Sequence, residues 1–331
     1  PPPGGRAVYQ QLSYRHGRVT SARFTRDAGS VVHSASWDGL PAAVFTTRIG
    51  GGGTRLLDLP SSEVLSVSSH GEVAISIGHR FVEGFHAAGR LAVAPLEGGE
   101  PRVLAEDIQE ADHTPDGREL AVIRRGGKGF RVELPLGRPL FEAAWVSHAR
   151  VSPDGAEVAC LVHPSPYDDR GDVVIVERAT GKGRVVSEGW SSVVGLAWSP
   201  AGDGLWFSAA RDGANNGVVA IDREGRETFA AETTGRLRLH DVASDGRVAV
   251  THDTWSVPLR VRPPGAAAEI DVSLSDVSMV ADMSEDGAVI VFGELGDVES
   301  SRGCYLRSTL GGQAVRLGDG GPLALAADGD R

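Results

Sequence analysis

Short runs of alternating apolar and polar residues recur along the chain, and each run leads into a tight turn. Ser or Asp precedes a glycine in most of these turns, Pro occurs in three of them, and a second apolar run follows. The eight turns are Phe24–Gly29 (one residue longer than the others), Val67–Gly71, His113–Gly117, Val151–Gly155, Trp198–Gly202, Val242–Gly246, Met283–Gly287 and Leu325–Gly329. Successive turn glycines are 42, 46, 38, 47, 44, 41 and 42 residues apart. This spacing identifies an internal repeat of about 43 residues.

Each repeat holds four short segments with the alternation of a β-strand. In the fifth repeat these are residues 193–198, 204–209, 218–222 and 227–231. Gly, Asp and Asn occupy the turns, where a positive φ or a bond from side chain to backbone is needed. No longer stretch keeps the 3.6-residue period of a helix. The pattern predicts an all-β fold, a β-propeller of four-stranded antiparallel blades, with about seven blades and a range of six to eight.

The two ends of the chain differ from the repeats. Residues 1–7 are rich in proline and glycine and are typical of the end of a linker. Residues 8–331 are then the propeller, whose last blade is expected to be truncated because the eighth turn lies so close to Arg331. Residues 8–14 precede the first inner strand, and we predict that they pair as the outer strand of a blade built from later sequence.

Polar residues gather on the first strand of several repeats, which is the innermost strand of a propeller blade. In each of these strands the polar residue lies between two apolar residues that pack against the neighbouring blades. Because successive side chains of a strand point to opposite sides, the polar residues are expected beside the central channel. The predicted ligand-binding residues are Asp112, His148, Arg150, His240, Asp241 and Asp282. Convergent polar groups in a channel suit a small ligand; the alternative is a wet channel that tolerates polar groups without one. We expect replacement of Asp241 and Asp282 by alanine to weaken ligand binding and leave stability nearly intact.

An acidic loop is the candidate metal site. Asp168, Asp169 and Asp172 lie within five residues, and Ca²⁺ takes clustered carboxylate oxygens. The alternative is a solvated loop in which Arg170 balances the local charge. Apart from this calcium site, the sequence predicts no cofactor.

Charge and cysteine content exclude other classes. The 331-residue chain has 33 basic and 44 acidic side chains and a formal charge of −11, whereas nucleic acids and anionic membranes bind basic surfaces. We therefore expect neither nucleic-acid binding nor membrane contact by this domain. Two cysteines provide neither a disulfide framework nor a structural zinc site.

Several longer segments resemble known propellers. The turns are similar to those of the periplasmic protein TolB and of peptidase-associated propellers. Other segments resemble the carboxy-terminal propeller of bacterial serine/threonine protein kinases: Tyr9–Tyr14, Ser34–Arg48, Leu91–Leu104, Val162–Val174, Gly189–Pro200 and Ala314–Gly318. This resemblance implies a kinase domain before residue 1 and a propeller that senses or docks a partner. It also implies a place outside the cytoplasm if the parent spans a membrane, and in the cytoplasm otherwise.

The chain has no sequence signature of catalysis. It lacks a Gly-x-Ser-x-Gly elbow, a P-loop, a dinucleotide fingerprint and the kinase motifs. We predict that it is not an enzyme but a sensory module that binds a small ligand or a protein. The alternative is an accessory propeller of a prolyl-oligopeptidase-type hydrolase, or a stand-alone propeller hydrolase with a metal in its channel.

Overall fold

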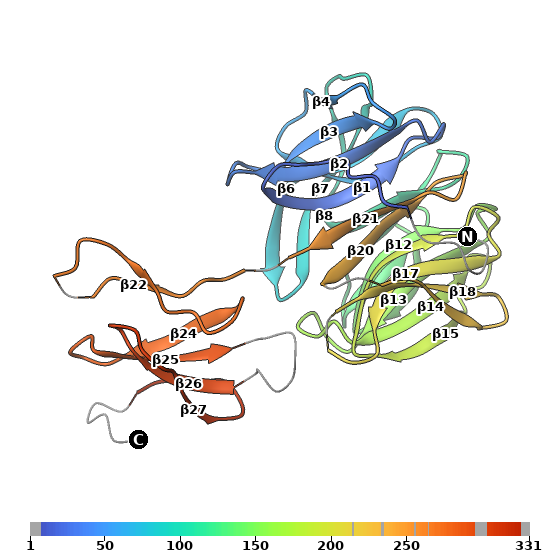
Figure 1. The fold of residues 1–331 in the computed structure, drawn as a ribbon. Helices are drawn as coiled ribbons and strands as arrows, with labels where there is room; N and C mark the ends of the chain where they lie inside the picture. The colour runs from blue at the N-terminus through green and yellow to red at the C-terminus, as the bar shows by residue number, and fades with distance from the viewer. Residues whose placement is uncertain are drawn as a thin grey trace. The chain divides into compact units, whose positions relative to one another are not determined.

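The part of the chain that the structure describes folds entirely into β-strands and loops (Figure 1). The structure is a computed structural model that describes residues 8–213, 215–232, 235–254, 256–263, 265–294 and 303–325. These residues contain no helix, and hence none able to cross a membrane. The chain divides into two compact units, Pro1–His252 and Asp253–Arg331.

The strands of the first unit form five antiparallel sheets. The first sheet comprises β1 (Gly17–Phe24), β2 (Ser30–Trp37), β3 (Ala43–Arg48) and β4 (Thr54–Leu56). The second comprises β5 (Ser62–Val67), β6 (Glu72–Glu83), β7 (His86–Pro95), β8 (Arg102–His113), β9 (Leu120–Arg125), β10 (Phe130–Glu133) and β11 (Pro139–Ala143). The third comprises β12 (Trp145–Val151), β13 (Glu157–His163), β14 (Gly171–Glu177) and β15 (Gly183–Trp190). The others comprise β16 (Ser192–Trp198), β17 (Gly204–Ala210), β18 (Gly217–Asp222) and β19 (Glu227–Ala231), and β20 (Arg236–Val242) with β21 (Val248–Asp253).

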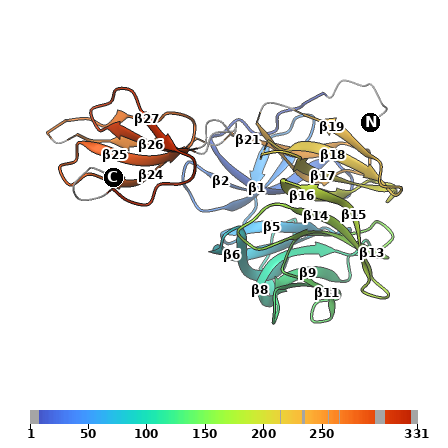
Figure 2. The same ribbon diagram turned by 90° about the horizontal axis from the view of Figure 1, so that it is seen from below.

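The seven-stranded sheet is two blades that share one long strand. The first part of β8 pairs with β7 as an outer strand, and its second part pairs with β9 as an inner strand. The first unit therefore has six inner strands, β1, β5, β8, β12, β16 and β20. Each contacts the next, and β20 contacts β1 as well as β16, so the inner strands close a ring (Figures 1 and 2).

The turn after each inner strand is stabilised by its own side chains. In the third repeat the Thr114 hydroxyl donates to Asp116, and the following glycine has a φ of 67°. The first turn has the same length, because the backbone N–H of Thr25 donates to the carbonyl of Ser30 and Ala28 takes a φ of 52°. The expectation of a longer first turn is therefore wrong: Ala28, and not the glycine after it, holds the left-handed position.

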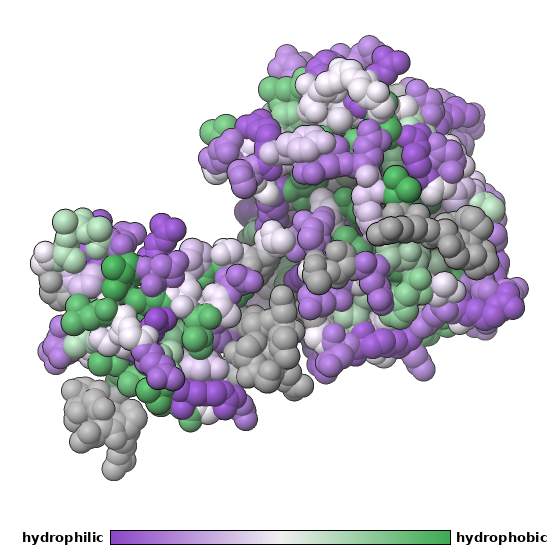
Figure 3. Space-filling view, viewed as in Figure 1, coloured by the Kyte–Doolittle hydropathy of each residue, from purple (hydrophilic) through white to green (hydrophobic). Residues whose placement is uncertain are grey.

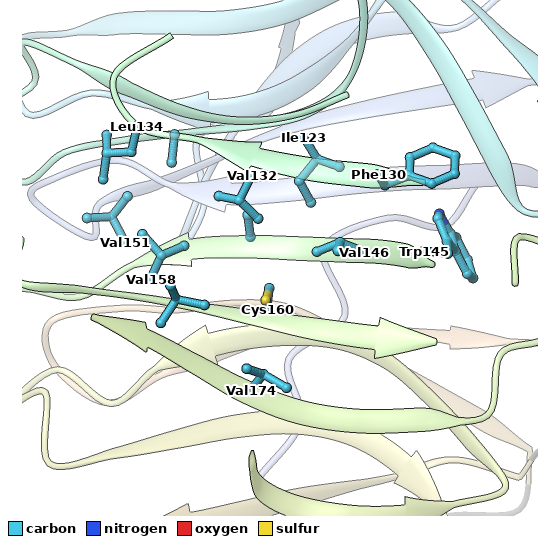
Figure 4. Close-up of a cluster of buried hydrophobic side chains, with 13 residues drawn as sticks. Ile123, Phe130, Val132, Leu134, Trp145, Val146, Val151, Val158, Cys160 and Val174 are labelled. Carbon is cyan, nitrogen blue, oxygen red and sulfur yellow. The ribbon is translucent and has the colours of Figure 1, made fainter. Parts of the chain in front are cut away.

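Apolar side chains pack between neighbouring blades. Between the third and fourth blades they form one cluster that includes Val132, Val158 and Val174, and Phe130 lies beside Trp145 at one end of it (Figure 4). Cys160 lies in the same cluster, and burial raises the pKa of its thiol to about 12. In the ring, each blade packs against a neighbouring blade on both of its faces. The apolar surface buried on both faces stabilises the ring.

The second unit contains a further four-stranded sheet and a small ribbon. The ribbon pairs β22 (Arg260–Val261) with β23 (Ile270–Asp271). The sheet comprises β24 (Ser278–Met283), β25 (Val289–Glu294), β26 (Gly303–Ser308) and β27 (Val315–Gly318), numbered in the order in which they pair. Phe292 and Tyr305 stack in its core.

The structure confirms the all-β propeller architecture and corrects one end of it. Inner strands of seven successive repeats are present, in agreement with about seven blades. Residues 8–14 form no strand, and Val8 and Tyr14 are 96% and 80% exposed, so the predicted outer strand is wrong. The alternation of this segment is too short to hold a strand without a sheet edge beside it. The linker prediction for residues 1–7 and the turn glycine of the eighth repeat lie outside the described residues.

Candidate functional site

An arginine on the inner strand of the fourth blade joins three blades. Arg150, on the inner strand of the fourth blade, donates from Nη2 to Asp241 Oδ1 at 2.6 Å, and its Nε lies 3.5 Å from Asp112 Oδ2. Its Nη1 donates to the carbonyl of His240 at 3.0 Å. Burial lowers the pKa of Arg150, but Asp112 and Asp241 together outweigh burial and raise it. Three of the predicted ligand-binding side chains are thus brought together as a buried ion cluster.

The two aspartates also tie each blade to the next. Asp112 Oδ2 accepts the backbone N–H of Val151 at 2.9 Å, and Asp241 Oδ2 accepts that of Phe24 at the same distance. In both contacts the donor lies at the end of the following inner strand. Because Phe24 belongs to the first blade, the second contact closes the ring between the sixth inner strand and the first.

A small residue in the fifth blade leaves space for the Arg150 side chain. The fifth blade stands between the fourth and the sixth, and at the matching position it carries Ala197, which is 1% exposed. Arg150 Nη1 also lies 3.4 Å from the carbonyl of Leu196, beside that alanine. A larger side chain at residue 197 would occupy the space through which Arg150 reaches Asp241.

A second arginine at the axis has no carboxylate of its own. Nη1 of Arg23 donates to the carbonyls of Ala22 and His240 at 2.9 and 2.8 Å. Its Nε is buried and has no acceptor within hydrogen-bond distance among the described residues. Burial, followed by the nearby Arg150, lowers the pKa of Arg23 to about 10.

The two predicted axial histidines are held neutral. Burial, followed by Arg238, lowers the pKa of both His148 and His240 well below the usual value. His148 also has a left-handed φ of 55°, in a bulge of the inner strand where the next blade carries Gly195 with a φ of 68°. Strained backbone of this kind in a non-glycine residue often marks a functional site.

Asp282 belongs to the second unit, and the other five candidates belong to the first. Its Oδ1 accepts the backbone N–H of Met283 at 2.8 Å, and its Oδ2 accepts that of Leu325 at 2.9 Å. The second contact repeats the blade-to-blade bond of Asp112 and Asp241. Leu325 itself lies in no strand among the described residues.

The three carboxylates of the acidic loop bind three different partners and do not converge on one point. Asp168 pairs with Arg170, Asp169 accepts from Ser192, and Asp172 accepts the backbone N–H of Gly189. No group of three metal-ligating side chains occurs in the part of the chain that the structure describes. The calcium site stays a prediction that this geometry does not support.

A serine–histidine pair was missed by the sequence analysis. Ser147 Oγ lies 2.8 Å from His163 Nε2, and His163 Nδ1 lies 3.0 Å from the carbonyl of Arg170. Because a carbonyl only accepts, Nδ1 carries the proton, and Nε2 accepts from the hydroxyl. Ser147 and His163 are only 2% and 3% exposed, so the hydroxyl has no room for a substrate. The pair joins β12 to β13.

The rim opposite the turns carries exposed aromatic side chains. The β6–β7 hairpin ends there, and its tip reaches the fourth blade, where the backbone N–H of Phe85 donates to the carbonyl of Pro166 at 2.7 Å. Phe81, Phe85 and Tyr167 are 62%, 54% and 67% exposed. We call Phe81, Val82, Phe85 and Tyr167 the aromatic rim. A break in alternation around residues 81–85 was the only signal in the sequence.

Comparisons with known proteins identify the fold. No protein-family model matches the chain, and no curated protein matches it. TolB from Acinetobacter baumannii superposes with a TM-score of 0.55 at 19% identity, over 67% of this chain and 56% of that one. A putative TolB from Agrobacterium tumefaciens gives 0.53 at 15%, over 71% and 89%. The propeller domain of the Trilobed protease from Pyrococcus furiosus gives 0.47 at 12%, over 92% and 98%. The chain has a TolB-like β-propeller fold, and it spans just over half of the first of these proteins.

Proposed function

We propose that the chain is a non-catalytic binding module that takes a protein partner at its aromatic rim. The observation that carries the proposal is the exposure of Phe81, Phe85 and Tyr167 at one end of the ring. Exposed hydrophobic residues also occur elsewhere, among them Leu310 and Val315 in the second unit, and Figure 3 shows hydrophobic residues in patches between hydrophilic ones. Exposed aromatic side chains on a rigid support are typical of the centres of protein interfaces.

The rim is held in place before any partner binds. Phe85 stacks on Trp145 of the fourth blade, with ring centroids 6.3 Å apart and planes 14° from parallel. Glu83 pairs with Arg125 of the third blade. The hairpin tip of the second blade is thereby fixed to two other blades. A partner would lose little entropy in ordering this surface, which favours affinity.

Arginines beside the rim indicate the chemistry of the partner. The Arg18 guanidinium lies over the Phe81 ring, 5.6 Å from its centroid, and the exposed Arg80 precedes Phe81 in the hairpin. Neither arginine has a carboxylate within 4 Å among the described residues. A protein segment with apolar side chains flanked by carboxylates matches both features.

We also propose which kind of larger protein contains this propeller. The resemblance of the longer segments favours attachment to a bacterial serine/threonine kinase, with the ring as the sensor. A place outside the cytoplasm follows only if that parent spans a membrane. The TolB-like fold fits an accessory propeller of a peptidase equally well.

A peptide-display experiment tests the rim. Peptides selected on the intact chain should be rich in apolar and acidic residues, and Phe81→Ser or Tyr167→Ser should weaken their binding about 10-fold or more. Leu56→Ser is the matched control, because Leu56 is 58% exposed on the edge strand β4, away from the rim. Equal binding by the rim variants and the control would refute the proposal.

A further inference from the structure

A buried histidine adjoins the hairpin tip that carries the aromatic rim. His86, the first residue of β7, is 4% exposed, and its ring meets the Phe130 ring edge-on, with centroids 4.7 Å apart. Its Nδ1 is buried and has no hydrogen-bond partner among the described residues. Glu83 Oε1 lies 3.9 Å from this nitrogen, which is too long for a hydrogen bond. The imidazole is thus enclosed with one ring nitrogen unbound.

The same carboxylate oxygen attaches the tip to the third blade. Oε1 of Glu83 binds Arg125 of β9, and the Arg125 guanidinium lies over the Phe130 ring, 5.7 Å from its centroid. Phe130, the residue of β10 that meets the imidazole, is uncharged and contacts both His86 and Arg125. We call Glu83, His86, Arg125 and Phe130 the His86 cluster.

A proton added to the His86 ring has no acceptor in this cluster. Both ring nitrogens are donors in the protonated form, and Nδ1 has no acceptor within hydrogen-bond distance among the described residues. A buried charged donor without an acceptor is costly. Glu83 can accept the proton only by moving toward His86 and away from Arg125. In either case the docked position of the tip becomes less favourable.

The charged groups around His86 act in opposite directions. Arg125 and His79 of β6 oppose a positive charge on the ring. Glu83 and Asp107 of β8 favour it. Burial is the largest effect and lowers the pKa of His86. Docking of the tip is therefore fully favoured above about pH 6.5 and loses free energy as pH falls toward the lowered pKa.

We propose that His86 makes the aromatic rim sensitive to pH: its protonation releases the hairpin tip from the third and fourth blades, and the partner then binds less tightly. Phe85, the residue before His86, is bound to the fourth blade through its backbone N–H and its ring. Release of the tip separates Phe85 from Trp145 and so divides the rim. The effect on binding depends on the function proposed above, whereas release of the tip does not.

The test follows the tip with a fluorine label and needs no partner. 4-Fluorophenylalanine replaces Phe85 in the full chain, and its ¹⁹F resonance is recorded from pH 7.5 to pH 5.5. The Trp145 ring stacked on the label shifts this resonance away from its value in urea. His86→Gln cannot take up the proton. His70→Gln, at an exposed position in the turn before Gly71, is the matched control.

The label should report release of the tip only where His86 is present. In the native chain and in His70→Gln, the resonance should move by about half or more of the way to its urea value at pH 5.5. In His86→Gln it should keep its pH 7.5 position. The same change in all three chains, or no change in the native chain, overturns the proposal.

A second variant applies if His86→Gln does not fold. Arg125→Gln removes a partner of Glu83 at a side chain that is 58% exposed. The resonance should then lie closer to its urea value already at pH 7.5, because the contact that protonation opposes is absent. A resonance that stays at the native position in Arg125→Gln overturns the proposal.

Binding of a peptide selected on the rim is measured over the same pH range. The native chain should bind about 3-fold or more weakly at pH 5.5 than at pH 7.5, and His86→Gln should bind equally at both. A label that moves while binding stays constant overturns the effect on binding, and with it the function proposed for the rim, but not the release of the tip.

Discussion

Asp241 illustrates how much one side chain contributes when it joins distant parts of the chain. It binds Arg150, which is 91 residues away in sequence, and the Phe24 backbone, which is 217 residues away. Its side chain is 11% exposed, so both contacts are made out of water. The geometry therefore reverses the expectation that replacement of Asp241 leaves stability intact.

Asp241→Ala should lower the free energy of unfolding by about 3 kcal/mol or more, because it leaves the Arg150 charge buried with one partner fewer. Asp245→Ala is the control, since Asp245 pairs with Arg247 on the surface, where solvent screens the interaction, and its loss of stability should be much smaller. Urea denaturation measures both changes. Similar losses in the two variants would show that the axial ion cluster does not hold the ring.

Gly195 lies at a position that has no space for a side chain. It has a φ of 68°, and a Cβ would lie 2.2 Å from the carbonyl oxygen of Leu239. Gly225 also has a positive φ, of 83°, but a Cβ there meets nothing within 4 Å. Substitutions at these two glycines therefore distinguish the cost of a strained backbone from the cost of steric overlap.

Gly225→Ala should therefore cost about 1 kcal/mol from the left-handed backbone alone. Gly195→Ala should cost about 2 kcal/mol more, because two inner strands must also move apart. Thermal or urea unfolding of both variants provides the comparison. Equal costs would mean that β16 and β20 are not in close contact.

At the scale of the element, the inner strands do two tasks with one alternating pattern. Residues on one side pack between blades, and those on the other face the axis. The fifth blade departs from the polar pattern with Ala197, and this gap allows Arg150 to reach the sixth blade.

Ala197→Leu should block that path and lower the free energy of unfolding by about 3 kcal/mol, from overpacking together with the strained ion contact. Ala220→Leu, at a half-buried position of β18, is the matched control and should cost about 1 kcal/mol or less. Retention of native stability by Ala197→Leu would argue that Arg150 takes another route.

At the scale of the whole molecule, ring closure should make the first unit independent. Its last inner strand contacts its first, and its inner strands need nothing from beyond His252 to complete the ring. We expect residues 8–252 alone to fold, with the melting temperature of the main transition of the full chain. Loss of cooperative unfolding in that segment would show that closure requires later repeats.

Acid should destabilise the chain through its buried histidines. Burial lowers the pKa of seven of them: His33, His79, His86, His113, His148, His163 and His240. On acidification the unfolded chain therefore takes up protons first, at about pH 6.5, while the folded chain does not. Stability is complete above that pH and is lost as pH falls toward the folded pKa values.

Each such histidine contributes a slope of up to about 1.4 kcal/mol per pH unit between pH 6.5 and its folded pKa. Free energies of unfolding measured from pH 7.5 to 5 should show this decline. His240→Gln should make the decline shallower by the contribution of one histidine, and His16→Gln, at an exposed position, is the control and should leave it unchanged. A flat profile in the native chain would contradict the buried, neutral state of these residues.

The fold could be predicted from the sequence because its determinants are local. Alternation within each strand and the turn before Gly117 or Gly155 depend on residues a few positions apart, and the repeat multiplies that signal. The same locality explains the error at Ala28: an alanine took the left-handed position beside a glycine, which sequence preference alone does not reveal.

The candidate site was predictable only in part. Alternation correctly placed Asp112, Arg150 and Asp241 on inner strands, because strand geometry determines which side a residue faces. Their pairing across a blade, the unpaired Nε of Arg23 and the meeting of Phe85 with Pro166 join residues that lie far apart in sequence. Such contacts depend on how many blades close the ring and at what angle, and packing of the whole ring determines both.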